Sequence, residues 1–251
     1  MKSPLIIGHR GAPERAVENT EASIRAALNE GALLIETDVR LTADDRIVLS
    51  HDPDFSRLGG PSTPIRRMRG SEIRKIRLTG GPGSDQAPLF MDHALRLFPR
   101  ARFNVDLKDP GPALVAAWCR LLEESGASQR CRTASFYDRS LRLYRRLRPG
   151  AALSAARFRV ITILLCTLIG LPCRPRSGED VLQIPEKRGI FRLITPRRLH
   201  CWHRWGWKVH AWTIDTESDM KRLASWGLDG IITNRPSLLR QLLEENPVET
   251  A

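Results

Sequence analysis

Two carboxylates occupy alternate positions in the apolar segment "LIETDV", at Glu36 and Asp38. Alternate side chains of a β-strand point to the same face. Two ionised carboxylates on one face repel each other unless a positive charge lies between them. Asp106, in the later segment "FNVDLK", can add a third oxygen ligand, and such a set suits Mg²⁺ or Ca²⁺. The alternative is an ion-pair network with Arg10 or Lys108, and the pattern leaves both interpretations open.

Two histidines add groups that can transfer protons. His9 ends one short apolar segment and precedes Arg10, and His51 ends another and precedes Asp52. Imidazole titrates near neutral pH, so one neutral and one protonated histidine can act as base and acid in the same reaction. Arg10 and Lys108 carry donors that suit phosphate oxygens. Together with the acidic cluster, these groups favour the cleavage of a phosphodiester.

The order of the predicted elements indicates how these residues come together. Eight apolar or β-branched segments predict strands at residues 5–7, 33–39, 103–107, 131–135, 151–154, 181–184, 209–214 and 230–233. Helices are predicted at residues 20–29, with Asn19 as the N-cap, and at 112–125, 138–147, 196–205, 217–226 and 236–244. Eight strands alternating with helices in 251 residues predict an α/β fold, a closed (β/α)₈ TIM barrel with its chemistry at the carboxyl ends of the strands. An open doubly wound sheet is the alternative, but it usually has fewer strands.

Residues 40–92 interrupt the alternation. They hold a short predicted strand at 47–50 and then a segment rich in Gly, Pro and Arg. The segment is too short to bury a core of its own. We interpret it as a small insertion in the second strand-to-helix loop of a single domain that covers residues 1–251.

Composition restricts the choice of partners. The net charge is +12, and Arg supplies most of the basic residues, which are scattered along the chain. Few aromatic residues are interleaved with them, so we expect a solvated basic surface and no nucleic-acid partner. The five cysteines show no CxxC spacing, and the N-terminus lacks the apolar core of a signal peptide. Both features predict a cytoplasmic protein; the oligomeric state is left open.

A strongly apolar stretch runs from Val160 to Leu171 without a charged residue. As a helix it would be about 18 Å long, which is too short to cross a bilayer about 30 Å thick. A buried crossover helix is the favoured interpretation. The arginines on both sides keep a second interpretation open, a peripheral contact with a membrane through residues 158–176.

The motifs in "GHRG…ENT…ETDVRLTADDRIVLSHD" resemble the signature of the glycerophosphodiester phosphodiesterase family. The later segments "NVDLK", "VHAWTID" and "DGIITNRP" resemble other segments of that family in the same order, so the similarity covers nearly the whole chain. The resemblance implies a TIM barrel that uses a divalent metal ion, Mg²⁺ or Ca²⁺. It would hydrolyse a small-molecule glycerophosphodiester to glycerol 3-phosphate and an alcohol.

The resemblance also implies roles for the side chains at matching motif positions. The acid and base are His9 and His51, and the phosphate contacts are Arg10 and Lys108. The metal ligands are Glu36, Asp38 and Asp106. The supports of the loop after the first strand are Glu18 and Asn19, and a wall of the pocket is Trp212.

Two positions depart from the family pattern. Asp106 stands where Glu is frequent, so its carboxylate is one methylene shorter and we expect it to bind the metal through water or at a deeper position. Asn234 stands where Asp is common, and we predict that it caps the last helix. In the Trp-rich segment, Trp202, Trp205 and Trp207 are predicted to pack a helix onto the barrel.

Two other functions remain as alternatives. The first keeps the site but takes lysophospholipids at a membrane surface, which is lysophospholipase D activity. The apolar stretch and the basic surface motivate it. The second is a phosphodiester-binding protein with weakened catalysis, and only the shortened Asp106 supports it.

Overall fold

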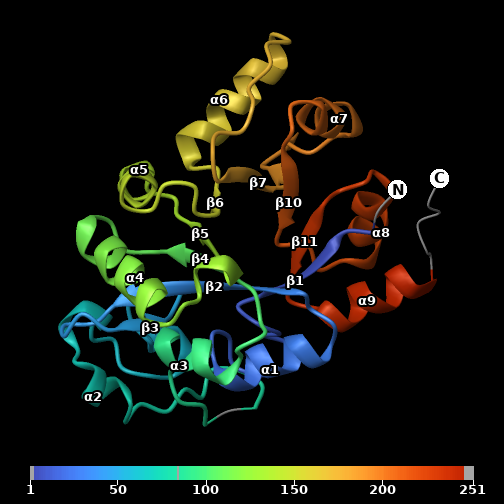
Figure 1. The fold of residues 1–251 in the computed structure, drawn as a ribbon. Coiled ribbons are helices and arrows are strands. Elements are labelled where there is room, and N and C mark those ends of the chain that lie inside the picture. Colours follow the sequence, from blue (N-terminus) through green and yellow to red (C-terminus); the bar gives the residue numbers. More distant parts are fainter. Residues whose placement is uncertain (1–2, 84, 246–251) are drawn as a thin grey trace.

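Eight parallel strands close into a barrel in the computed structural model, which describes residues 3–83 and 85–245. The strands are β1 (Leu5–His9), β2 (Leu34–Leu41), β4 (Phe103–Leu107), β5 (Cys131–Ala134), β6 (Leu153–Ser154), β7 (Glu179–Pro185), β10 (Lys208–Trp212) and β11 (Gly230–Thr233). They neighbour one another in the order β1, β11, β10, β7, β6, β5, β4, β2, and a β1–β2 pairing closes the ring. Figure 1 shows this ring with the helices outside it. The predicted TIM barrel is confirmed.

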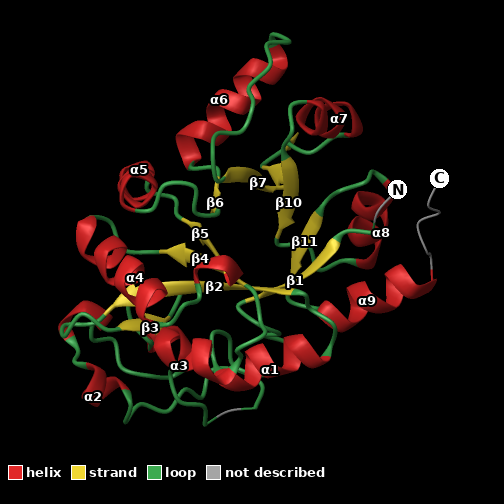
Figure 2. Cartoon of the chain, in the orientation of Figure 1, coloured by secondary structure: helices red, strands yellow, loops and turns green. Residues whose placement is uncertain are grey.

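The connecting helices cover the outside of the ring (Figure 2). They are α1 (Glu21–Asn29), α3 (Met91–Leu97), α4 (Pro112–Glu124), α5 (Asp138–Leu147), α6 (Arg157–Leu168), α7 (Pro196–Arg204), α8 (Glu217–Ser225) and α9 (Pro236–Glu245). Three short 3-10 turns are η1 (Ser56–Leu58), η2 (Ile65–Arg67) and η3 (Ser128–Arg130). The core between strands and helices buries Trp202 and Trp207 almost completely, and Trp205 packs against it, as predicted.

The predicted insertion follows β2. It contains β3 (Ile47–Leu49), which pairs antiparallel with β2, and the single-turn helix α2 (Gly70–Ile73). The expectation that it buries no core was wrong. Phe55, Ile65, Ile73 and Phe90 of the insertion belong to a small hydrophobic cluster that also includes Val17 from the loop after β1. The insertion therefore packs against the barrel loops and places the end of β3 at the barrel mouth.

The start of α1 differs from the prediction. Thr20 is the N-cap, because its backbone is extended and its hydroxyl accepts a hydrogen bond from the Ser23 N–H at 3.3 Å. Asn19 has a φ of 57°, in the left-handed region, which directs its side chain away from the helix. Its amide instead contacts β2, where it bonds Thr37 and Asp38.

The apolar stretch after β6 is not a buried crossover helix. Within α6 only Ile163 is buried, whereas Phe158, Leu165 and Leu168 are exposed. Figure 1 shows α6 extending outward from the ring of strands. The sequence prediction failed because an apolar run with no polar face fits a buried helix and an exposed one equally well. Among the residues that the structure describes, no helix is long and apolar enough to cross a membrane.

Two hairpin strands follow β7, β8 (Lys187–Arg188) and β9 (Phe191–Arg192), and they pair antiparallel outside the barrel. The hairpin precedes α7 and stands at the same end of the barrel as the loops after β1, β2 and β4, since residues of both regions line one pocket. It was not predicted.

Candidate active site

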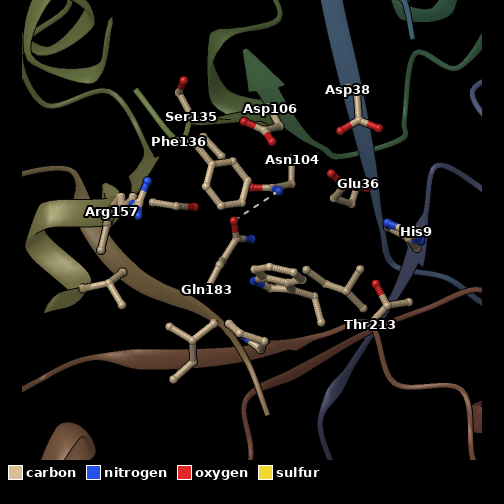
Figure 3. A pocket seen from close by; sticks show the side chains of 18 of the residues that line it. His9, Glu36, Asp38, Asn104, Asp106, Ser135, Phe136, Arg157, Gln183 and Thr213 are labelled. Carbon is tan, nitrogen blue, oxygen red and sulfur yellow. Dashed lines mark hydrogen bonds between the residues drawn. The ribbon is translucent and has the colours of Figure 1, made fainter. Parts of the chain in front are cut away.

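A cavity of about 670 Å³ opens at the carboxyl ends of the barrel strands. It brings together eight of the residues that the sequence singled out, His9, Arg10, Glu36, Asp38, His51, Asp106, Lys108 and Trp212. Figure 3 shows Glu36, Asp38 and Asp106 projecting from their strands toward this space, with His9 at one side. Glu18 and Asn19 lie behind this wall, where they bond Arg10 and Asp38.

Lys108 lies between two carboxylates of the cluster. Its Nζ is 2.9 Å from Oδ1 of Asp38 and 2.6 Å from Oδ2 of Asp106. The Nε of Arg10 is 3.0 Å from the other oxygen of Asp38. Strand register explains the arrangement, because Asp38 and Asp106 are direct partners on β2 and β4. Arg10 and Lys108 therefore form the ion-pair network with the carboxylates that the sequence offered as an alternative to a metal site.

The three carboxylates titrate differently. Burial and the nearby charge of Asp38 raise the pKa of Glu36 well above its ordinary value. Burial also raises the pKa of Asp106, against the opposing effect of Lys108. For Asp38 burial acts in the same upward direction, but Lys108 and Arg10 outweigh it and hold the pKa below its ordinary value. The pocket thus contains one carboxylate stabilised as an anion and two that resist ionisation.

His9 is held by a side chain from the far end of the chain. Its Nδ1 is 2.7 Å from Oδ1 of Asn234, and Nδ2 of Asn234 donates to Asp215 at 2.6 Å. The amide oxygen can only accept, so Nδ1 of His9 carries a proton and Nε2 is left as the basic atom of the neutral ring. Burial, together with the charge of Arg10, lowers the pKa of His9. The prediction that Asn234 caps the last helix is replaced by this contact, since α9 begins two residues later.

His51 lies at the end of the insertion strand and its surroundings are acidic. Its Nδ1 is 2.8 Å from Oδ1 of Asp52. Burial opposes ionisation of Asp52, but hydrogen bonds from His51 and Arg57 outweigh it and lower the pKa of Asp52. The contact with Asp52 orients the His51 ring. The two histidines therefore have different partners, the amide oxygen of Asn234 for His9 and the carboxylate of Asp52 for His51.

A chain of ion pairs connects the loop that follows His9 with the loop that carries His51. Arg57 pairs with Asp52 and also with Glu18, at 2.5 Å and 2.6 Å. Glu18 pairs in turn with Arg10 at 3.0 Å. Although burial raises the pKa of Glu18, the two arginines outweigh it and keep this pKa low. The chain fixes the loop after β1 against the loop after β3.

Gly11 is required by the tight turn that presents His9 and Arg10. Its φ is +92°, and a Cβ added here would lie 2.4 Å from Oγ of Ser23. The Ser23 hydroxyl holds the turn from the other side, because it donates to the Arg10 carbonyl and accepts from the Ala12 N–H. The backbone N–H of Asn19 also donates to the Arg10 carbonyl.

Several pocket residues were not assigned a site role from the sequence. Asn104 lies two positions before Asp106 on β4, and its Nδ2 donates to Gln183 at 3.3 Å across the cavity (Figure 3). The period of two along "FNVDLK" is a signal that could have identified Asn104. Phe136 packs edge-on against Trp212, with ring centroids 6.1 Å apart, and Lys108 lies over the same Phe136 ring. Phe136 follows β5 in a loop, and the short fragment "SF" at residues 135–136, which resembles a segment of the same family, was too weak a signal to assign it a role.

The side-chain oxygens of the pocket are of the type that binds a hard cation, although they are not yet arranged around a common point. In residues 3–83 and 85–245, no group of three or more His, Cys, Asp and Glu side chains is close enough to hold a metal ion as it stands. However, Oδ1 of Asp106 and Oδ1 of Asn104 are buried without a hydrogen-bond partner. Glu36 accepts a 3.3 Å hydrogen bond from the Arg10 N–H, and the charges of Lys108 and Arg10 do not outweigh the effects of burial, Asp38 and Asp106, which raise its pKa. Oxygen atoms left in this condition are the ligands that Mg²⁺ and Ca²⁺ prefer.

The closed barrel with a polar cavity at the carboxyl ends of its strands places the chain among the TIM-barrel proteins, and the comparison with known proteins defines the family. The chain belongs to the glycerophosphoryl diester phosphodiesterase family, whose model matches residues 9–110 and 174–238. It is accordingly a phosphoric diester hydrolase. One relative, the probable glycerophosphodiester phosphodiesterase 2 of Mycobacterium tuberculosis, is 31% identical over 95% of this chain and 90% of its own length. Another, the mouse lysophospholipase D GDPD3, is 23% identical over 98% of this chain and 83% of its own length.

Solved structures agree on the fold. A glycerophosphoryl diester phosphodiesterase from Silicibacter pomeroyi superposes with a TM-score of 0.83 at 20% identity, over 100% of this chain and 97% of the other. An Oleispira antarctica phosphodiesterase in complex with the product sn-glycerol-3-phosphate gives a TM-score of 0.77 at 22% identity, over 96% and 97% of the two chains.

Proposed function

We propose that this enzyme hydrolyses glycerophosphodiesters to glycerol 3-phosphate and an alcohol, with a divalent metal ion and with His9 and His51 as base and acid. The observation that carries the proposal is the pairing of a buried, neutral His9 with a carboxylate-supported His51 in one pocket. The related structure with glycerol 3-phosphate bound supports the same substrate class.

Arg10 and Lys108 bind the phosphate in this proposal. Both side chains line the cavity. Burial lowers the pKa of Lys108, but the charges of Asp106 and Asp38 outweigh it and raise this pKa above its ordinary value. Lys108 has three donors, and the two carboxylates use only two of them. The face formed by Trp212 and Phe136 is suited to the apolar edge of the glycerol or alcohol group.

The proton transfers are assigned from the partners of the two rings, since Asn234 leaves Nε2 of His9 as its basic atom and Asp52 holds His51, which we assign as the acid. Nε2 of His9 takes a proton from the attacking water as its oxygen forms a bond to phosphorus. His51 gives a proton to the oxygen of the departing alcohol as the P–O bond breaks. One water is consumed, and each histidine is returned to its starting state by exchange with solvent. Arg10 and Lys108 stabilise the charge that develops on the phosphate oxygens.

Glu36, Asp38 and Asp106 would hold the metal ion, with Asn104 as a further oxygen. The unpartnered Oδ1 of Asp106 and the disfavoured ionisation of Glu36 support this assignment. When bound, the ion supplies Lewis-acid activation and neutralises charge on the phosphate. A cation here would also lower the raised pKa of Glu36 and of Asp106, since it favours their ionised forms.

A product assay tests the proposal. Purified enzyme is incubated with glycerophosphocholine, glycerophosphoethanolamine and glycerophosphoglycerol, each with Mg²⁺, Ca²⁺, Mn²⁺ or EDTA, and glycerol 3-phosphate is measured. We expect release that requires a metal and stops with EDTA. Full activity in EDTA would refute the proposed metal requirement. If calorimetry shows that the diesters bind but are not hydrolysed with any of the metals, the protein is a phosphodiester-binding protein instead.

Lysophospholipase D activity is the second candidate. The cavity wall on the side of α6 is apolar, with Val160, Ile161 and Leu164 in the lining, and an acyl chain can lie along it. A relative bears this activity in its name. Comparing rates on lysophosphatidylcholine and glycerophosphocholine decides between the candidates: a preference for the lysolipid favours the second, and turnover of the soluble diester alone excludes it.

We also propose a cytoplasmic location. Cys119, Cys131, Cys166, Cys173 and Cys201 are all free thiols, which suits a reducing compartment. Fractionation of the native cells tests it, and recovery of the protein outside the cytoplasm would refute the proposal.

A further inference from the structure

The exposed apolar side chains are concentrated in two neighbouring segments. Of the twelve large hydrophobic residues exposed in the described part of the chain, eight lie on α6 with its following turn or on the β8–β9 hairpin. Those eight are Phe158, Ile161, Leu165, Leu168, Ile169, Leu171, Ile190 and Phe191. Both segments contribute residues to the lining of the same pocket. Exposed apolar residues that gather in this way mark a binding site more often than a scatter of single residues does.

Both segments are held in place by hydrogen bonds and ion pairs with the rest of the protein. On α6, the Thr167 hydroxyl accepts from Nε1 of Trp202 at 2.8 Å, and Arg159 donates to the Arg174 carbonyl. Nε1 of Trp207 donates to the Cys173 carbonyl and so holds the loop that leads from α6 to β7. The exposure of α6 is thus a fixed orientation of an anchored helix.

The hairpin is anchored in the same way, through a buried carboxylate. Glu186, which is 5% exposed, pairs with Arg222 at 2.9 Å and with Arg192 at 3.2 Å. Beyond this anchor Ile190 and Phe191 are 93% and 70% exposed. The tip of the hairpin therefore presents two large apolar side chains to the surroundings.

The charges around these apolar residues have one sign. Residues 155–178 and 187–214 contain no Asp or Glu, while both segments carry several arginines. Arg157, Arg174 and Arg188 are exposed and form no ion pair within the described residues. An apolar surface edged by unpaired arginines complements the interface of an anionic bilayer, where phosphates lie above the acyl chains. A second copy of this chain would bring like charges together on this face.

The same surface borders the active-site cavity. Arg157, Ile161 and Leu164 of α6 line it, and so does Arg188 of the hairpin. We propose that α6 and the β8–β9 hairpin together form a membrane-binding face that docks the enzyme on an anionic phospholipid bilayer, with the cavity mouth beside the lipid headgroups. The hairpin extends the contact beyond residues 158–176.

Vesicle co-sedimentation of the full chain tests this face without any measurement of turnover. The probes are phosphatidylcholine vesicles with and without phosphatidylglycerol, at low and high salt. We expect binding to the vesicles that contain phosphatidylglycerol, weakened by salt, and little binding to phosphatidylcholine alone. Absence of binding to phosphatidylglycerol vesicles would overturn the proposal whether or not the enzyme hydrolyses diesters.

Matched variants locate the contact. Leu165→Ser with Leu168→Ser removes apolar surface from α6, and Phe191→Ser removes it from the hairpin; none of these residues lines the cavity. Each variant is expected to lose about tenfold or more in vesicle binding. The control is Leu33→Ser, an exposed leucine outside the face, which should bind as the wild type does. Equal binding by all variants, or a wild-type dimer that the α6 variant dissociates, would overturn the assignment.

Discussion

Nδ1 of His9 lies 2.7 Å from the amide oxygen of Asn234, and the amide nitrogen of Asn234 is bound to Asp215. This contact connects the end of β1 to the loop after β11, the neighbouring strand in the barrel. Because the amide orientation is fixed by Asp215, only the oxygen can face His9. The pair sets which ring nitrogen is basic, so Asn234 acts as a positioning residue for His9.

Asn234→Ala tests this role. Loss of the hydrogen bond lowers the pKa of His9 further, since the Asn234 contact raises that pKa against burial and Arg10. We expect kcat/KM to fall by roughly 10- to 100-fold, and the acidic limb of its pH profile to move to lower pH. A rate and profile identical to the wild type would contradict a positioning role, and Asn234→Gln is the conservative comparison.

His51→Gln separates acid catalysis from folding. His51 is part-exposed, so the variant should keep its melting temperature. We expect kcat to fall by about 10²–10⁴-fold for diesters with a poorly leaving alcohol. A diester of p-nitrophenol, whose leaving group needs no proton, should lose far less. An equal loss on both substrates would contradict the role of His51 as the acid.

Glu36→Gln should change how stability depends on pH. In the metal-free wild type, the folded-state pKa of Glu36 is raised above the ordinary 4.5. The folded protein therefore holds a proton that the unfolded chain releases, and stability falls as the pH rises from about 4.5 through the folded pKa. We expect the melting temperature of the wild type to fall across this window relative to that of Glu36→Gln. Parallel curves would contradict the raised pKa.

Lys108→Met tests the competition between Lys108 and a metal ion for two carboxylates. Removing the ammonium leaves buried Asp38 and Asp106 without their main counter-charge, and we expect the metal-free variant to lose roughly 2–4 kcal/mol of stability. Calorimetry should show tighter binding of Mn²⁺ than in the wild type, while turnover falls because a phosphate contact is lost. Weaker Mn²⁺ binding would show that Lys108 does not compete with the ion.

The strand pattern predicted the centre of the site but not the contact that orients His9. Glu36, Asp38 and Asp106 could be placed together because alternate residues of a strand point to the same face, and the two strands that carry them are neighbours in a barrel. Asn234 could not, because an Asn just before a helix fits a local cap and a contact with a residue 225 positions away equally well. The orientation of α6 was also missed, because burial depends on what a helix packs against and not on its own composition.

The release of glycerol 3-phosphate from glycerophosphocholine, measured side by side for the wild type, His9→Ala and His51→Ala, tests the central claim most directly. We predict metal-dependent release by the wild type and a loss of at least about 10²-fold in each folded variant. Release by the His9→Ala variant at the wild-type rate would contradict the account of the site. Absence of release by the wild type with Mg²⁺, Ca²⁺ and Mn²⁺ would contradict the proposed function itself.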